Sequence, residues 1–85
     1  MKLKTKYEFV EIGDEITAVP VGDHSFTGVL IINETMRDVM KLLEKETSED
    51  AVISTIYERY NAERNTVTED VHGILQQLAK DKFIS

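Results

Sequence analysis

The stretch Thr27–Thr35 limits the possible folds of this chain more than any other. It reads Thr-Gly-Val-Leu-Ile-Ile-Asn-Glu-Thr, so four consecutive apolar residues end at Asn33, a residue type that often caps helices. Residues before the stretch are β-prone, and residues after it follow a helical period. A strand that is apolar on both faces is more than a small antiparallel sheet in an 85-residue chain can cover unaided. The stretch therefore predicts a strand against which another molecule docks.

Two further β-prone runs precede it. Tyr7–Ile12 and Ile16–Val21 flank Gly13-Asp14, which indicates a hairpin. Pro20 lacks an N–H, so the second strand must end near it or turn that position outward. After a turn-like Gly22–Ser25, Val29–Ile32 supplies a third strand. We expect a three-stranded antiparallel meander whose third strand lies at an edge.

Three helices are predicted after this sheet. The first begins at a cap formed by Asn33 or Thr35, and its apolar residues recur at i, i+3, i+4 and i+7: Met36, Val39, Met40 and Leu43. The second begins at a cap formed by Thr47 or Ser48, with acidic residues in its first turn, and ends near Tyr60.

The third predicted helix begins at a capping box, Thr66 with Glu69, and ends near Lys80. Three strands followed by three helices indicate an α+β fold of the winged helix-turn-helix type. The length predicts one domain over residues 1–85. Within it, the alternating lysines of residues 1–6 are expected to form a flexible solvated tail, the alternative being the polar face of an incoming strand.

Residues suited to catalysis or metal binding are sparse. The chain has no cysteine, its two histidines (His24 and His72) are far apart, and its four glycines are scattered, so no metal site, nucleophile or phosphate loop is predicted. We expect no enzyme activity, no catalytic residue, no metal and no cofactor.

The charge balance bears on partners. A formal net charge of −6 and a sequence pI near 4.8 argue against a nucleic-acid partner, because such binding relies on Lys and Arg. The longest apolar run has four residues, which predicts no membrane span and no signal peptide, and hence a cytoplasmic protein.

One basic stripe is present on the first predicted helix. Arg37, Lys41 and Lys45 recur at i, i+4 and i+8. Two interpretations are open: a solvated helix face flanked by acidic residues, or a docking site for an acidic partner.

The third predicted helix has two unlike flanks beside its core stripe of Val67, Val71, Ile74 and Leu78. One flank is acidic and polar, with Asp70, Gln77 and Asp81. The other is nearly uncharged, with Thr68, His72, Leu75 and Ala79. The uncharged flank suits either a broad core contact or the wall of a groove.

Taken in order, several short segments resemble the PqqD-like family, the relatives of coenzyme pyrroloquinoline quinone synthesis protein D. These segments are Val19–Gly22, Phe26–Thr35, Leu42–Glu44, Thr47–Asp50, Tyr60-Asn61 and Asp70-Val71. The resemblance extends from about Tyr7 to Ile84. Met36 and Met40 depart from the family pattern, which has a small residue and an aromatic residue at these positions.

The resemblance implies a peptide-recognition element of natural product biosynthesis. Such a domain would bind the leader of a ribosomally made precursor peptide as an added strand and present it to a modifying enzyme, commonly a radical S-adenosylmethionine enzyme. The expected peptide-binding residues are Gly28, Val29, Leu30, Ile31, Ile32, Asn33, His72, Leu75, Gln76 and Ala79. Strand addition needs an open edge, which the predicted third strand offers.

Two other function classes stay open. A winged-helix regulator would bind duplex DNA through the third predicted helix, although Glu69 and Asp70 near the start of that helix would repel phosphate. A self-associating module would instead pair the exposed edge with a second copy. The chain is therefore expected to be a monomer or a weak homodimer.

Overall fold

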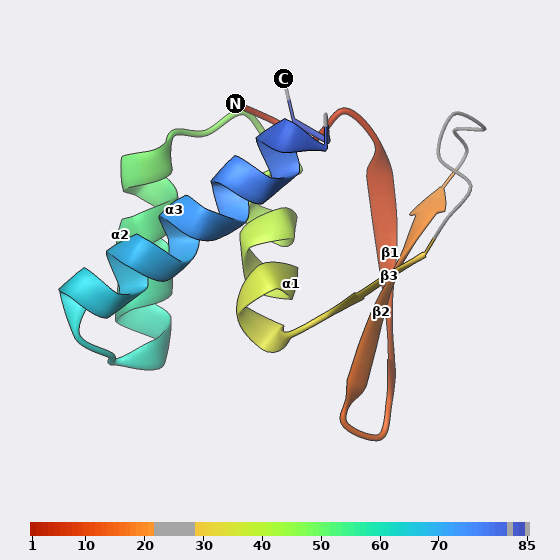
Figure 1. The fold of residues 1–85 in the computed structure, drawn as a ribbon, viewed down its shortest axis with the longest axis horizontal. Coiled ribbons are helices and arrows are strands. Elements are labelled where there is room, and N and C mark those ends of the chain that lie inside the picture. The colour runs from red at the N-terminus through yellow and green to blue at the C-terminus, as the bar shows by residue number, and fades with distance from the viewer. Residues whose placement is uncertain (22–28, 82, 85) are drawn as a thin grey trace.

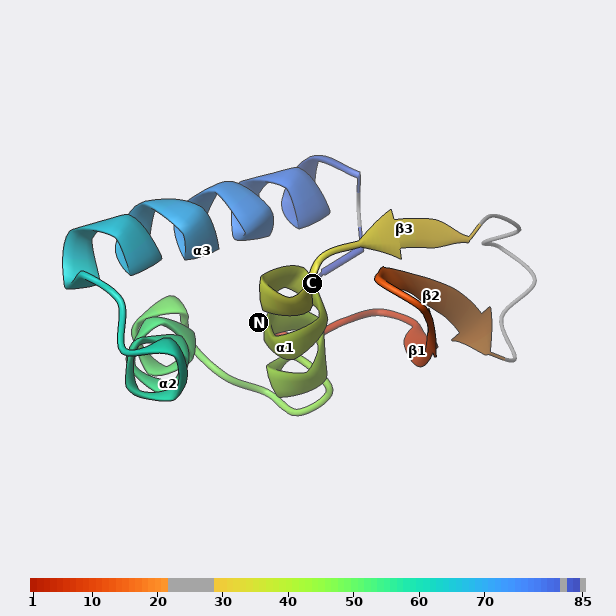
Figure 2. The ribbon, with the colours of Figure 1, turned by 90° about the horizontal axis from the view of Figure 1, so that it is seen from below.

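The computed structural model describes residues 1–21, 29–81 and 83–84, and in it three helices pack beside a small sheet (Figure 1). The strands are β1 (Lys6–Ile12), β2 (Glu15–Val21) and β3 (Leu30–Ile32), and the helices are α1 (Glu34–Leu42), α2 (Glu49–Tyr60) and α3 (Arg64–Lys80). In Figure 2, α1 lies between the sheet and α2, and α3 runs across one side of α1 toward β3. The predicted α+β fold, three antiparallel strands followed by three helices, is confirmed.

The sheet has the order β1-β2-β3, with both pairs antiparallel. The β1–β2 hairpin turns through Gly13-Asp14, and Gly13 takes a φ of 61°. A glycine with positive φ at the first of two loop residues is the pattern of a type II′ turn, whose twist matches that of paired strands. The predicted hairpin is therefore confirmed. The predicted turn at Gly22–Ser25 lies outside the described residues.

The helix caps follow short-range chemistry. Asn33 accepts a hydrogen bond from the Met36 amide at 2.8 Å, and Ser48 accepts one from the Ala51 amide at 3.2 Å. Asn33 is therefore the N-cap of α1, rather than Thr35, and Ser48 is the N-cap of α2, rather than Thr47. Asn61 ends α2 in the left-handed conformation, with a φ of 49°.

The predicted start of the third helix is wrong. α3 begins at Arg64, and its N-cap, Glu63, makes no side-chain capping hydrogen bond. Thr66 and Glu69 therefore lie inside the helix rather than forming a capping box. Both side chains are exposed there, so their inclusion in the helix buries neither polar group.

The core joins the inner face of the sheet to all three helices. Its largest fully buried side chains are Met40, Leu43, Ile56, Leu78, Val39, Val52 and Val71. Strand positions alternate in this packing: Tyr7, Ile16 and Ala18 are buried, whereas Val10 and Ile12 are exposed on the outer face.

The first residues are not the flexible tail that the lysine alternation predicted. Leu3 is only 7% exposed and belongs to the core. Its amide donates to the Leu43 carbonyl at 2.9 Å, and the Lys4 amide donates to the Phe83 carbonyl at 2.9 Å. Leu3 also forms a bridge with Ile84, which brings the two ends of the described chain together (Figure 1). Leu3 and the buried Thr5 therefore anchor the segment.

Candidate functional site

β3 is the edge strand of the sheet. In the part of the chain that the structure describes, it pairs with β2 on one side and with no strand on the other. Three residue pairs define its register: Leu30 with Ala18, Ile31 with Thr17, and Ile32 with Ile16. An open edge carries unpaired peptide groups, which is the requirement for adding a foreign strand.

The register indicates which peptide groups face the open edge. A two-residue hairpin loop closes on a hydrogen-bonded pair, here Ile12 with Glu15, and such pairs alternate along an antiparallel ladder. The peptide groups of Thr17 therefore point toward β1, and those of Ile16 and Ala18 point toward β3. Because Ile31 lies opposite Thr17, its N–H and C=O point away from β2.

Pro20 helps to keep this strand short. By the same alternation, position 20 faces the β3 side, where proline has no N–H to donate. The last described pair of the β2–β3 ladder is Ala18 with Leu30, two residues before Pro20. Pro20 therefore limits pairing between β2 and β3. It does not limit pairing between β2 and β1, where Pro20 lies opposite Tyr7.

The side chains of the apolar run divide between the two faces of the sheet. Leu30 and Ile32 are partly buried against the core, whereas Ile31 is 72% exposed and Val29 is 58% exposed. This is the two-sided apolar strand that the sequence indicated. Gly28, the first of the expected peptide-binding residues, lies outside the described part of the chain.

A small groove continues from the end of β3. It has a volume of about 210 Å³ and is lined by Asn33, Thr35, Asp70 and Ile74. Asn33 and Thr35 come from the start of α1, and Asp70 and Ile74 come from α3. In Figure 2, α3 and β3 lie on the same side of α1. The groove wall opposite the edge strand is therefore the flank of α3 that carries Asp70.

The α3 residues expected from the sequence to bind the peptide, His72, Leu75, Gln76 and Ala79, do not line this groove. His72 is exposed and its Nδ1 lies 3.3 Å from a carboxylate oxygen of Glu49 on α2. Leu75 is a core residue with 4% exposure, while Ile74 is only partly buried. Gln76 and Ala79 are exposed, and the helical period places them on the same side as His72.

A helical wheel of α3 alone does not identify the flank that lines this groove. It distinguishes a core stripe from its two sides, but it does not say which side faces the sheet. A useful signal was nevertheless present. Ile74 and Leu75 are both apolar and lie at opposite borders of the core stripe, so either one could be the more buried. The packing of α3 against α2 decides which of them faces the core.

A polar cluster around the buried Asp38 ties α1 to the end of α2. Asp38 is 4% exposed; its carboxylate accepts hydrogen bonds from the Tyr60 hydroxyl and, at 3.2 Å, from Arg37 Nε, and it lies 3.4 Å from Arg59. Burial alone would raise the pKa of Asp38, but the hydrogen bonds from Tyr60 and Arg37 and the two positive charges hold it below its ordinary value. Burial, together with the Asp38 carboxylate, raises the pKa of Tyr60. Neither described groove includes these side chains, so we assign the cluster a structural role.

This cluster predicts acid sensitivity. Because the pKa of Asp38 is lower in the folded than in the unfolded state, its contribution is complete above about pH 4, the unfolded value, and is lost as the pH falls through the folded pKa. Asp38→Asn should lower the free energy of unfolding by about 1–3 kcal/mol at neutral pH, a deficit that shrinks in acid. Urea unfolding of both proteins from neutral to acid pH measures this, with exposed Glu58→Gln as the control. An Asp38→Asn deficit that is the same at every pH would contradict the assignment.

The predicted basic stripe is not one uniform surface. Arg37 is ion-paired with Glu11 and Asp38, and its side chain is 20% exposed. Lys41 is exposed and lies over the Phe9 ring, with 5.7 Å from its Nζ to the ring centroid. Lys45 is exposed at the rim of a second, larger groove. Arg37 therefore serves the fold, and only the two lysines remain for a docking role.

Among the described residues, no group of three or more His, Cys, Asp or Glu side chains is arranged to hold a metal ion. No helix in the same part of the chain has the length and apolar character needed to cross a membrane.

Comparison with known proteins gives two matches. A family model described as coenzyme PQQ synthesis protein D (PqqD) matches residues 24–84. The solved structure of TbiB1 in complex with the TbiA(beta) leader peptide is similar to this one with a TM-score of 0.72 and 21% sequence identity, covering 100% of this chain and 95% of that chain. No curated protein matches the sequence. The structural likeness concerns the fold, and the family match covers most of the chain.

Proposed function

This chain belongs to the coenzyme PQQ synthesis protein D (PqqD) family, and from that membership and the geometry of β3 we propose that it is a non-catalytic peptide chaperone. Its ligand is the leader segment of a ribosomally made precursor peptide. The leader binds by strand addition and is presented to a modifying enzyme of the radical S-adenosylmethionine type, which supplies the catalysis. The observation that carries the proposal is the open edge of β3.

Backbone pairing supplies the first part of the interaction. The outward N–H and C=O of Ile31 bond the leader, and the added strand extends along Val29 and Asn33 on either side. The Asn33 carbonyl already accepts the Arg37 amide at 3.0 Å, so Asn33 contributes its N–H only. A ladder of this kind binds many sequences, since it involves backbone groups alone.

Side-chain contacts supply selectivity. Alternate side chains of an added strand point to opposite faces of the sheet. Those on the helix side enter the groove between Thr35 and Ile74, where Ile74 offers an apolar wall and Asp70 a negative charge. Those on the other side meet the exposed Ile31. The leader therefore needs an apolar residue for the groove, and a nearby basic residue would be favoured.

The structure of TbiB1 with the TbiA(beta) leader peptide supports the proposal by analogy, because a protein of the same fold is bound there to a peptide of this class. Since the leader becomes ordered on binding and the edge is short, we expect a dissociation constant that is roughly micromolar, about −8 kcal/mol.

Titration of isotope-labelled protein with the leader peptide encoded beside it tests the proposal. We expect chemical shift changes in β3, at Thr35, and at Asp70 and Ile74 of α3, with little change in α2. A scrambled leader of the same composition is the control. Changes confined to other surfaces, or equal binding of the scrambled peptide, would refute the proposed site.

A further inference from the structure

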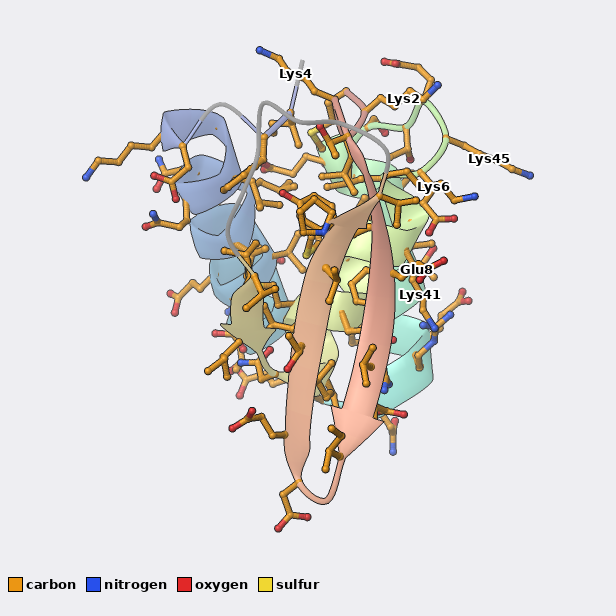
Figure 3. All side chains as sticks on the ribbon, turned by 90° about the vertical axis from the view of Figure 1, so that its right-hand side faces the viewer. Lys2, Lys4, Lys6, Glu8, Lys41 and Lys45 are labelled. Atoms are coloured by element: carbon orange, nitrogen blue, oxygen red, sulfur yellow. The ribbon has the colours of Figure 1, made fainter. Side chains whose placement is uncertain are left out.

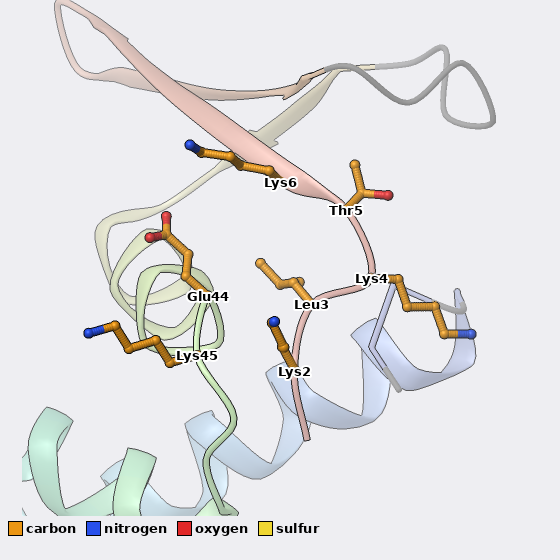
Figure 4. A pocket seen from close by; sticks show the side chains of 7 residues that line it. All are labelled: Lys2, Leu3, Lys4, Thr5, Lys6, Glu44 and Lys45. Atoms are coloured by element: carbon orange, nitrogen blue, oxygen red, sulfur yellow. The ribbon is translucent and has the colours of Figure 1, made fainter.

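A second groove lies at the other end of α1. It has a volume of about 450 Å³, within the range of about 300–1,000 Å³ that is usual for ligand pockets. It is lined by Lys2, Leu3, Lys4, Thr5, Lys6, Glu44 and Lys45 (Figure 4). The N-terminal segment thus forms one wall and the residues that follow α1 form the other. The groove forms where the N-terminal segment packs back on the core through Leu3 and bonds to Leu43 and Phe83.

The groove concentrates positive charge in an acidic chain. Five of the seven lysines of the sequence lie in segments 2–6 and 41–45, and four of these five line the groove. Figure 3 shows Lys2, Lys6, Lys41 and Lys45 along one side of the molecule. With a net charge of −6 overall, the rest of the chain is more acidic than its total suggests. This surface therefore attracts anions while its surroundings repel them.

Glu44 is the negative group within the groove. Figure 4 shows its carboxylate between the side chains of Lys6 and Lys45, while Lys4 points away from the other lysines. Neither Lys6 nor Lys45 is within ion-pair distance of a carboxylate among the described residues. Glu44 thus weakens the positive field of the groove without pairing closely with either lysine.

We propose that this lysine-lined groove binds a short acidic segment of a partner protein. Its charge favours carboxylates, and its volume accommodates a few side chains rather than a large surface. An extended nucleic acid is disfavoured, since its regularly spaced phosphates would also cross the acidic remainder of the chain.

The groove is separate from the proposed leader site. The leader groove lies at the start of α1, beside Asn33 and Thr35, and the lysine-lined groove lies just beyond its end, at Glu44 and Lys45. A nine-residue helix separates them, which corresponds to about 13 Å. Both ligands are therefore able to bind at once, and the protein would hold a leader on one side while a partner contacts the other.

The test is a titration of labelled protein with a short oligoglutamate peptide at low salt. We expect chemical shift changes at residues 2–6, 44 and 45, and weaker binding as salt is added. Lys6→Glu/Lys45→Glu should reduce the affinity about tenfold or more. Lys80→Glu, which reverses the same charge on α3, should change it by less than about twofold. Glu44→Gln should raise the affinity about threefold, because it removes the competing carboxylate.

The Glu44 variant is expected to bind oligoglutamate more tightly and the lysine variant more weakly. Because a folding defect would not raise the affinity, the Glu44 variant still tests the proposal if the lysine variant folds poorly. Unchanged or weaker oligoglutamate binding by folded Glu44→Gln would overturn the proposal. So would oligothymidylate binding at least as tightly as oligoglutamate, which would indicate a nucleic-acid site. Leader binding at β3 should be the same in all these variants, so failure of this proposal and failure of the leader site are separable.

Discussion

Ile31→Pro is expected to fold and to lose most of its affinity for the leader peptide. The substitution removes the N–H that points away from β2 and places a pyrrolidine ring where the added strand must approach. The bonds between β2 and β3 are carried by Leu30 and Ile32, so the sheet retains them. We expect a loss of about ten- to a hundredfold, from one ladder bond of about 1 kcal/mol and the added steric conflict.

Two variants separate the backbone effect from other causes. Ile31→Thr keeps the N–H and the β-branched shape, so it should bind the leader within about threefold of the unchanged protein. Leu30→Pro removes a bond to β2 and should destabilise the fold itself. Calorimetric titration measures the affinities, and circular dichroism verifies folding. A folded Ile31→Pro protein with unaltered affinity would rule out strand addition at this edge.

Ile74→Ala is expected to weaken leader binding about tenfold, whereas His72→Ala should change it by less than about twofold. Ile74 lines the groove beside the edge strand, and covering its side chain with the leader buries apolar area worth roughly 1–2 kcal/mol. His72 faces Glu49 of α2, and loss of that exposed pair costs less than about 1 kcal/mol of stability.

Residues 72 and 74 are two positions apart on α3 but face different sides of it. Comparing the two alanine variants therefore shows which side of α3 the peptide contacts. Ile74 is partly buried, so its stability should be measured by urea unfolding alongside the affinity. The milder Ile74→Val should still weaken binding by about threefold if the larger truncation proves unstable. The reverse result, with His72→Ala weak and Ile74→Ala unchanged, would return the peptide to the flank that carries Gln76 and Ala79.

The fold was largely predictable because its signals are local. The hairpin at Gly13, the caps at Asn33 and Ser48, and the helical stripe through Met40 each depend on residues within a few positions of one another. Such patterns are set by turn geometry and helix periodicity, which a sequence displays directly. The exception, α3, began earlier than its Thr66 signal because an exposed helix end can extend at little cost.

The geometry of the candidate site was only partly predictable. The edge strand followed from the apolar run and from its position as the last strand of a meander. Its partner wall did not, because the choice between Ile74 and His72 depends on how α3 is rotated against α2 and the sheet. The direction in which the N–H and C=O of Ile31 point also could not be predicted. It depends on the register of β3 against β2, and on that of β2 against β1 from the hairpin loop at Gly13.

By itself the sequence determined the order of elements, the apolar edge strand and the acidic balance, since each depends on residue type and on spacing along the chain. Tertiary structure decided which flank of α3 faces the groove, which peptide groups of β3 are open, and that residues 2–6 pack back to form a lysine-lined groove. Those features join segments that are distant in sequence, such as Leu3 with Leu43 and Asn33 with Asp70. Their contacts depend on packing free energy that is shared by the whole core, so no local pattern records them.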